Sequence, residues 1–423
     1  MIIQFTVGNF LSFKEKVTLS MVKSAKHELP ENVIKINDDF ELLKSAVVYG
    51  ANASGKSNLI YALSFMRFFT IYSVKAFQGG EEIGINGFLL NEQTKNKPSF
   101  FEIVFIVDNI TYRYGFEADN KTVQKEWLYY TPKTKEERLF FRESQEIKLS
   151  ENFPEGKDKE TNTRENCLFL TVVSQLNGPI SSKIIKWFMK IHTSSYPSIH
   201  SIISRIERDP NLKEEIMKFV SIADNGVKDF RMTSTDIPQE QSSEGTPQKK
   251  KKETVKKIVH FIHNVFNEKN EVSGELSIDL DTFESEGTKK MFALSVPIIN
   301  ALRNGEILLI DELENHLHTR LFKHIIKLFN SYSNKNNAQL IFATHNLTCM
   351  NNECFRRDQI WFTEKNSFGE SGLFSLADYK LDDKKIRNDA IYSKDYLLGK
   401  YGAVPFIDDI ILSFKEKDNE PSK

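Results

Sequence analysis

Apolar residues recur along this chain with two different periods, which predict strands and helices in alternation. Residues 2–21 carry apolar side chains at every second position, which predicts two strands with a turn near Lys14. Residues 58–70 carry them at a spacing of three or four, which predicts a helix. Its expected buried face comprises Leu59, Leu63, Met66 and Phe69. The chain therefore begins as a mixed α/β protein.

In the middle of the chain the pattern changes from strands to helices. Residues 100–107 and 110–116 flank Asp108 and Asn109, which predicts a β-hairpin. Residues 234–252 contain few apolar side chains and end in four lysines, which predicts a flexible loop. That lysine run is either solvated or a contact for an acidic partner or nucleic acid. Between hairpin and loop, helical spacing is found in residues 168–176, 182–191 and 212–220.

Two apolar runs in the second half each end in polar side chains. Residues 305–312 and 337–346 have the pattern of buried parallel strands, and a helical pattern over residues 317–332 separates them. A strand, a helix and a second strand at this spacing predict a βαβ unit. The carboxyl ends of the two strands then meet at one edge of a sheet.

The clearest chemical motif is a glycine-rich loop that precedes the predicted helix at residue 58. Gly50 and Gly55 bracket four residues and are followed by Lys56 and Ser57, which is the pattern of a phosphate-binding loop. Backbone N–H groups must converge on a polyphosphate there, and the helix N-terminus adds unpaired donors. The alternative is a glycine-rich turn with an exposed lysine. The expected ATP-binding residues here are Gly50, Asn52, Ala53, Ser54, Gly55, Lys56, Ser57 and Asn58.

Acidic and basic side chains at the ends of the two buried strands complete this site. Asp311 and Ser57 are expected to hold Mg²⁺, and Glu312 to polarise the attacking water as general base. His345 follows the second strand, where it is expected to hydrogen-bond the γ-phosphate. The expected catalytic residues are thus Lys56, Glu312 and His345. The alternative for the two acids is an exposed strand end without a ligand.

A second helix start precedes the strand that ends at Asp311. Ser285, Gly287 and Thr288 open a predicted helix over residues 289–302 and offer hydroxyls, a glycine N–H and a positive dipole end. In isolation this is only a helix cap. Its position just before the acidic strand favours a role in binding ATP.

Composition restricts the possible partners and location. The net charge of −1 gives no global attraction to nucleic acid, so any such surface would have to be local. The three cysteines are too few and too scattered for a disulfide framework, which favours a reducing cytoplasm. No run of about 18 apolar residues predicts a membrane span. His260 and His263 have no supporting ligand cluster, so packing is favoured over metal binding.

These motifs, in this order, resemble the ABC-type ATPase head of SMC, RecF and related proteins. In that resemblance residues 285–288 are the signature motif, Leu317 and His318 form the D-loop, and His345 is the switch histidine. It implies a P-loop α/β fold with a mixed or parallel sheet, N-terminal antiparallel strands and an inserted helical lobe. It also implies a homodimer or higher oligomer that sandwiches ATP, with Ser285 completing the partner's site.

This chain departs from that family at three positions, and one family residue stays open. Glu284 stands where leucine is usual, Glu286 where glycine is common, and His318 where the D-loop has aspartate. Gln93 is the nearest candidate for the glutamine that senses Mg²⁺ in such ATPases, and a solvated surface loop is the alternative.

The domain boundaries expected from this resemblance divide the chain into four parts. Residues 1–150 form the first part of the head with the phosphate loop, and residues 151–233 the inserted helical lobe. Residues 234–253 form a flexible loop, and residues 254–423 complete the head.

Two later segments resemble a bacterial subfamily of such ATPases that includes RloA-like and AbiL-type proteins. They are residues 356–365 and residues 396–405; the structural alternative is a strand and a helix that close the head. The resemblance implies anti-phage defence or abortive infection, together with a separately encoded RloB-type nuclease-like effector. Two alternatives stay open: a DNA-repair or DNA-clamping ATPase, and a sensor that binds ATP without turnover.

Overall fold

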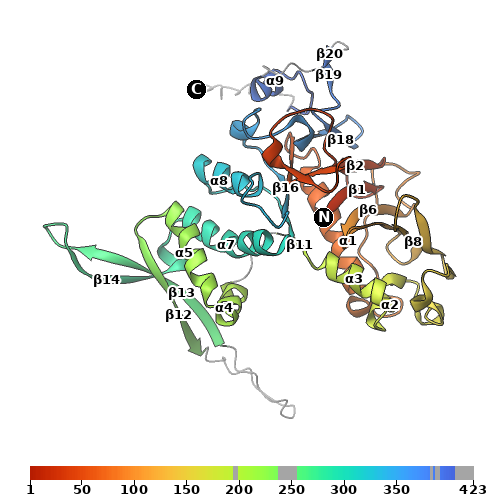
Figure 1. The fold of residues 1–423 in the computed structure, drawn as a ribbon, viewed down its shortest axis with the longest axis horizontal. Coiled ribbons are helices and arrows are strands. Elements are labelled where there is room, and N and C mark those ends of the chain that lie inside the picture. The colour runs from red at the N-terminus through yellow and green to blue at the C-terminus, as the bar shows by residue number, and fades with distance from the viewer. Residues whose placement is uncertain (194–198, 237–254, 382–383, 386–390, 405–423) are drawn as a thin grey trace, which may run out of the picture.

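The structure is a computed structural model that describes residues 1–193, 199–236, 255–381, 384–385 and 391–404 (Figure 1). The loop predicted over residues 234–253 lies outside these ranges except for its first three residues, which end a strand. The lysine run at its end and Pro405 are outside as well. Among the helices in these ranges, none combines the length and the apolar surface that a bilayer span requires.

The central sheet carries the predicted βαβ unit. Its strands, in spatial order, are β11 (Ile191–Thr193), β15 (Ile307–Ile310), β16 (Gln339–Ala343), β5 (Ser45–Gly50), β17 (Ile360–Lys365) and β18 (Ser371–Ser375). The first five run parallel, and β18 is an antiparallel edge. All six residues of β5 are buried: Val47 and Tyr49 contribute to one core, Ala46 and Val48 to the other. This explains its continuous apolar run, because both faces are covered.

The second sheet is antiparallel, as the N-terminal alternation predicts. Its strands, in spatial order, are β10 (Glu146–Leu149), β9 (Glu137–Glu143), β8 (Val123–Thr131), β7 (Ile110–Ala118), β6 (Ser99–Val107), β1 (Ile2–Gly8) and β2 (Val17–Ser20). Strands β6 and β7 pair around Asp108 and Asn109, which both have positive φ, so the hairpin prediction is confirmed. The two predicted N-terminal strands are confirmed as the pair β1 and β2.

Helix α1 (Lys56–Ala76) packs between the two sheets (Figure 1). Its predicted buried face is confirmed, because Leu59, Leu63, Met66 and Phe69 are each at most 2% exposed. The helix is longer than the predicted residues 58–70 at both ends. On the other face of the central sheet, α7 (Glu286–Asn304) and α8 (Thr319–Phe329) complete the second core.

The segment predicted as one helical lobe divides between two cores. Helices α2 (Phe169–Gln175) and α3 (Pro179–Phe188) join the core between the sheets, where the Trp187 ring stacks 3.9 Å from Phe105. Helical spacing shows that a helix has an apolar face, but it does not show which core that face packs against. The boundaries of the four predicted parts stay a prediction.

A separate core lies on a different face of α7. It contains residues of α4 (Ile199–Arg208), α5 (Asn211–Ala223), β12 (Val227–Asp236), β13 (Val255–Phe266) and α6 (Leu280–Phe283). Strand β14 (Val272–Asp279), which is mostly exposed, pairs with β13 at the edge of this small sheet. The Phe292 ring of α7 meets Phe230 and Phe261 of the small sheet, at 5.4 and 5.5 Å. Figure 1 shows this unit projecting to one side of the head.

In the small sheet of this unit, His263 pairs with Glu284 at 2.8 Å, and His260 contacts the Thr233 hydroxyl at 2.9 Å.

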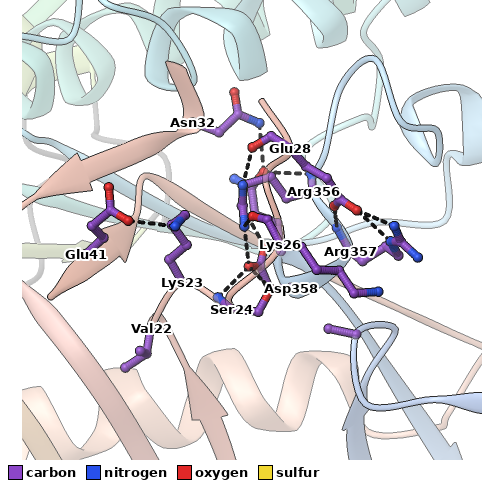
Figure 2. Close-up of polar contacts among 12 residues, drawn as sticks. Val22, Lys23, Ser24, Lys26, Glu28, Asn32, Glu41, Arg356, Arg357 and Asp358 are labelled. Carbon is purple, nitrogen blue, oxygen red and sulfur yellow. Dashed lines mark hydrogen bonds and ion pairs between the residues drawn. The ribbon is translucent and has the colours of Figure 1, made fainter. Parts of the chain in front are cut away.

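The first of the two resembling segments is hydrogen-bonded to a loop near the start of the chain (Figure 2). Arg356 is buried, bonds Asp358 at 2.8 Å, and donates to backbone carbonyls of Lys26 and Glu28. Arg357 donates to the Glu28 carboxylate at 2.7 Å. Charge-assisted hydrogen bonds thus join two segments that are distant in sequence. The second resembling segment begins within α9 (Tyr392–Leu397). The other described strands are β3 (Val33–Lys35), β4 (Glu41–Leu43), β19 (Lys380–Leu381) and β20 (Lys384–Lys385).

Candidate nucleotide site

The phosphate loop joins the end of β5 to the start of α1, as the sequence predicts. Gly50 and Gly55 have φ of 154° and 116°, which side-chain-bearing residues rarely adopt. A Cβ on Gly55 would lie 2.6 Å from the Ser371 hydroxyl, so no side chain fits there. The first turn of α1 has no side-chain cap, and its N–H groups remain available to an anion.

Lys56 folds back over this loop. Its ammonium donates to the Gly50 carbonyl at 2.9 Å and to the Ala51 carbonyl at 2.8 Å. Burial lowers the pKa of Lys56, and the carboxylates of Asp311, Glu314 and Glu312 oppose that shift. The structure therefore brings the acidic end of β15 close to the lysine of the phosphate loop.

One cavity of about 490 Å³ unites the two halves of the predicted site. Its lining comprises Asn52, Ala53, Ser54, Gly55, Lys56, Ser57, Asn58, Glu312, His345 and Lys365. The loop residues, Glu312 and His345 come from three neighbouring strands, β5, β15 and β16, whose carboxyl ends meet at one edge of the sheet. The volume lies within the range of small-molecule sites.

Lys365 also lines the cavity, although no sequence motif indicates a role for it in the site. It is exposed at the end of β17, which pairs in parallel with β5, so it lies beside the phosphate loop. The only signal in the sequence is its position at the end of an apolar run, residues 360–363. Which strand lies next to β5 cannot be read from that run.

The two acids after β15 differ in their surroundings. Glu312 has a φ of 51°, and its carboxylate accepts a hydrogen bond from the Asn315 side-chain amide. Asp311 is exposed. Within the described residues, neither the Asp311 carboxylate nor the exposed Ser57 hydroxyl has a hydrogen-bond partner. Both offer hard oxygen ligands, so these two residues fit a Mg²⁺ ion.

His345 lies two residues after the end of β16 and is exposed to the cavity. Its backbone N–H donates to the Glu314 carboxylate at 2.5 Å, which ties the loop after β16 to the loop after β15. Strands β15 and β16 are parallel neighbours joined through α8, so the predicted βαβ unit is confirmed.

The predicted signature residues lie at the start of α7 and do not line this cavity. Ser285 is exposed and caps the helix by accepting from the Thr288 N–H at 3.1 Å. Thr288 is 3% exposed, and its hydroxyl lies 2.7 Å from that of Ser285. Gly287 lies between them and is half-buried. Ser285 is therefore the most accessible hydroxyl of this segment.

The remaining family positions have local roles in the structure. His318 caps α8 by accepting from the Arg320 N–H at 3.2 Å. Gln93 is exposed in a turn, where its backbone N–H donates to Asn91 at 2.9 Å. Neither residue lines the cavity.

Together the central parallel sheet, the loop before α1 and the acidic end of β15 define an α/β P-loop ATPase head with an N-terminal antiparallel sheet. The model of the family described as "AAA domain, putative AbiEii toxin, Type IV TA system" matches residues 45–351. The chain belongs to this AAA family.

No curated protein matches the chain. Among solved structures, it is similar to the SMC head domain from Thermotoga maritima, at 13% identity and a TM-score of 0.39, over 88% of this chain and 98% of that one. It is also similar to an SMC head bound to the C-terminal winged-helix domain of ScpA (13%, 0.44, 88% and 97%) and to RecF with ATP (13%, 0.34, 88% and 97%).

Proposed function

We propose that this protein binds ATP with Mg²⁺ between two copies of itself, hydrolyses it, and thereby controls a separately encoded effector. The observation that carries the proposal is the single cavity lined by the phosphate loop, Glu312 and His345. A phosphate cradle, a carboxylate and a histidine at one sheet edge are the groups that phosphoryl transfer to water requires.

The residues of the cavity have distinct roles in this reaction. The N–H groups of the loop and the Lys56 ammonium hold the β- and γ-phosphates and stabilise charge that develops on them. Glu312 accepts the proton of the attacking water. His345 donates to the γ-phosphate and orients it for in-line attack. A Mg²⁺ ion held by Ser57 and Asp311 would neutralise charge on the same phosphates.

The position of the signature residues supports a dimer that sandwiches ATP. Ser285 is exposed at a helix N-terminus and lies outside the cavity of its own subunit. A hydroxyl at the positive end of α7 suits a phosphate. A second copy can therefore present Ser285 to the nucleotide held by the first.

The proposal of an effector and of a role in defence rests on the two later segments, residues 356–365 and residues 396–405. Their resemblance to RloA-like and AbiL-type ATPases supports a role in anti-phage defence beside an RloB-type nuclease-like protein. The matching family's description, which names a toxin of a toxin–antitoxin system, is compatible with such a role. Co-purification with the nuclease-like neighbour in the presence but not the absence of ATP would support this part.

The enzymatic part is tested by Glu312→Gln, which keeps the side chain's shape but removes the base. We expect ATP binding to be retained and phosphate release to fall by roughly 10²- to 10⁴-fold. Glu268→Gln, at an exposed position in the turn between β13 and β14, is the matched control. Wild-type turnover by Glu312→Gln would refute the assignment of the base. Background phosphate release by the unmodified protein would refute hydrolysis and favour an ATP-binding sensor.

A further inference from the structure

Lys290 is a buried lysine that the ATPase chemistry described above does not use. It lies near the start of α7, five residues after Ser285, and is only 4% exposed. Its ammonium donates to the backbone carbonyl of Glu312 at 3.0 Å. A buried ammonium is costly unless its hydrogen bonds are made, so an apolar residue would serve simple packing better.

The backbone that Lys290 contacts is itself in an unfavourable conformation. Glu312 has a φ of 51°, in the left-handed region that residues with a Cβ avoid. Besides Lys290, the Asn315 N–H donates to the same carbonyl, at 3.2 Å. The Glu312 carboxylate accepts from the Asn315 side chain. Such a conformation persists only where several contacts define it, and Lys290 supplies one of them from a different element.

The start of α7 also packs closely on the loop that follows Glu312. A Cβ built on Gly287 would lie 3.0 Å from the His316 carbonyl, so there is little space between them. The same short stretch of helix thus carries Ser285 at the surface, contacts this loop at Gly287, and holds Glu312 through Lys290. A displacement of the helix start cannot leave the backbone of Glu312 unaffected.

We infer that Lys290 is a positioning residue, which fixes the general base from the signature helix of the same subunit. Through the Glu312 carbonyl it aims the carboxylate into the cavity, and it couples contact at Ser285 to the geometry of the base. The inference rests on the proposed function, in which Glu312 is the base and Ser285 contacts the partner's nucleotide. With Lys290 in this role, hydrolysis at one site depends on how Ser285 of the same subunit contacts the partner.

The test compares Lys290→Met with Lys290→Arg and with a matched lysine elsewhere. Lys44 is also 4% exposed, donates to the Ser331 carbonyl at 2.7 Å, and lies before β5 at the opposite end of that strand from the phosphate loop. We expect Lys290→Met to lower kcat by roughly 10- to 100-fold, as misplaced catalytic groups do, with KM for ATP and equilibrium ATP binding unchanged. Lys290→Arg, which keeps a donor, should recover most of the rate. Lys44→Met should leave kcat unchanged.

The outcomes separate this inference from the proposed function. If Lys290→Met turns over at the wild-type rate while Glu312→Gln is inactive, the positioning role is refuted and the proposed function stands. Equal losses of kcat in Lys290→Met and Lys44→Met, with equal losses of thermal stability, would make Lys290 merely structural. Should Lys290→Met fail to fold, Lys290→Gln decides by the same split between kcat and KM. Wild-type protein without turnover would refute both.

Discussion

Helices α1 and α7 begin in opposite ways, although both starts are expected to meet phosphate. Helix α1 begins after Gly55 without a side-chain cap, and its first three residues line the cavity. Helix α7 is capped by Ser285, whose hydroxyl accepts from Thr288. The first helix start is thus left open for an anion held in its own subunit. The second is satisfied on its own and can be presented at the surface until a partner's nucleotide arrives.

Each helix also carries a buried lysine near its start. The two lysines differ in whether they contact the phosphate loop or the backbone of the general base. Lys56 lines the cavity and contacts carbonyls of the phosphate loop, from which a phosphate can draw it away. Lys290 is not among the residues that line the cavity, and it contacts the backbone of Glu312. One lysine is placed to bind the nucleotide, the other to hold the group that activates water.

Among the variants at the two helix starts, Lys56→Ala is expected to have the largest effect, because it removes the lysine at the open start of α1. Loss of the ammonium removes a charge-assisted contact to two phosphates, so kcat/KM for ATP should fall by roughly 10²- to 10³-fold or more. Lys44→Ala removes an equally buried lysine and should leave kcat/KM nearly unchanged. Steady-state phosphate release measures both variants. A small effect of Lys56→Ala would mean that the cavity does not hold the triphosphate as described.

The phosphate loop and the βαβ unit could be predicted because their signals are local. Gly50 and Gly55 report backbone geometry directly, and the run before Asp311 reports a strand covered on both faces. Lys365 and Lys290 could not be predicted, since each reaches the site across elements distant in sequence. Strand order puts β17 beside β5, and a helix crossing brings Lys290 under Glu312. A single sequence lists the residues that make such contacts, but it does not show which distant residues pack against each other.

A smaller effect is expected from pH, and it tests the buried state of Lys290. Burial lowers its pKa to about 8, while Glu314 and Glu312 oppose the shift. An unfolded lysine keeps its proton up to a pH of about 10.4. Between these pH values the unfolded chain binds more protons, so the free energy of unfolding should rise with pH, by up to about 3 kcal/mol. Urea denaturation at pH 8 and pH 10 should show that rise in wild type and a weaker one in Lys290→Met. Equal slopes would mean that the folded state does not depress this pKa.

The smallest effect on stability is expected at Ser285, where it separates capping from contact with the partner. Ser285→Ala removes the cap of α7 and should lower the free energy of unfolding by about 1 kcal/mol, whereas Ser285→Asp restores a capping oxygen and should keep it near wild type. If Ser285 meets the partner's nucleotide, both variants should still bind ATP, because the cavity of their own subunit is intact. Both should then lose ATP-driven dimerisation, measured by sedimentation in the Glu312→Gln background, since alanine cannot donate and aspartate repels phosphate. Dimerisation by Ser285→Asp as strong as that of its parent would show that the cap is the whole role of this serine, and the two helix starts would then differ only in how they are capped.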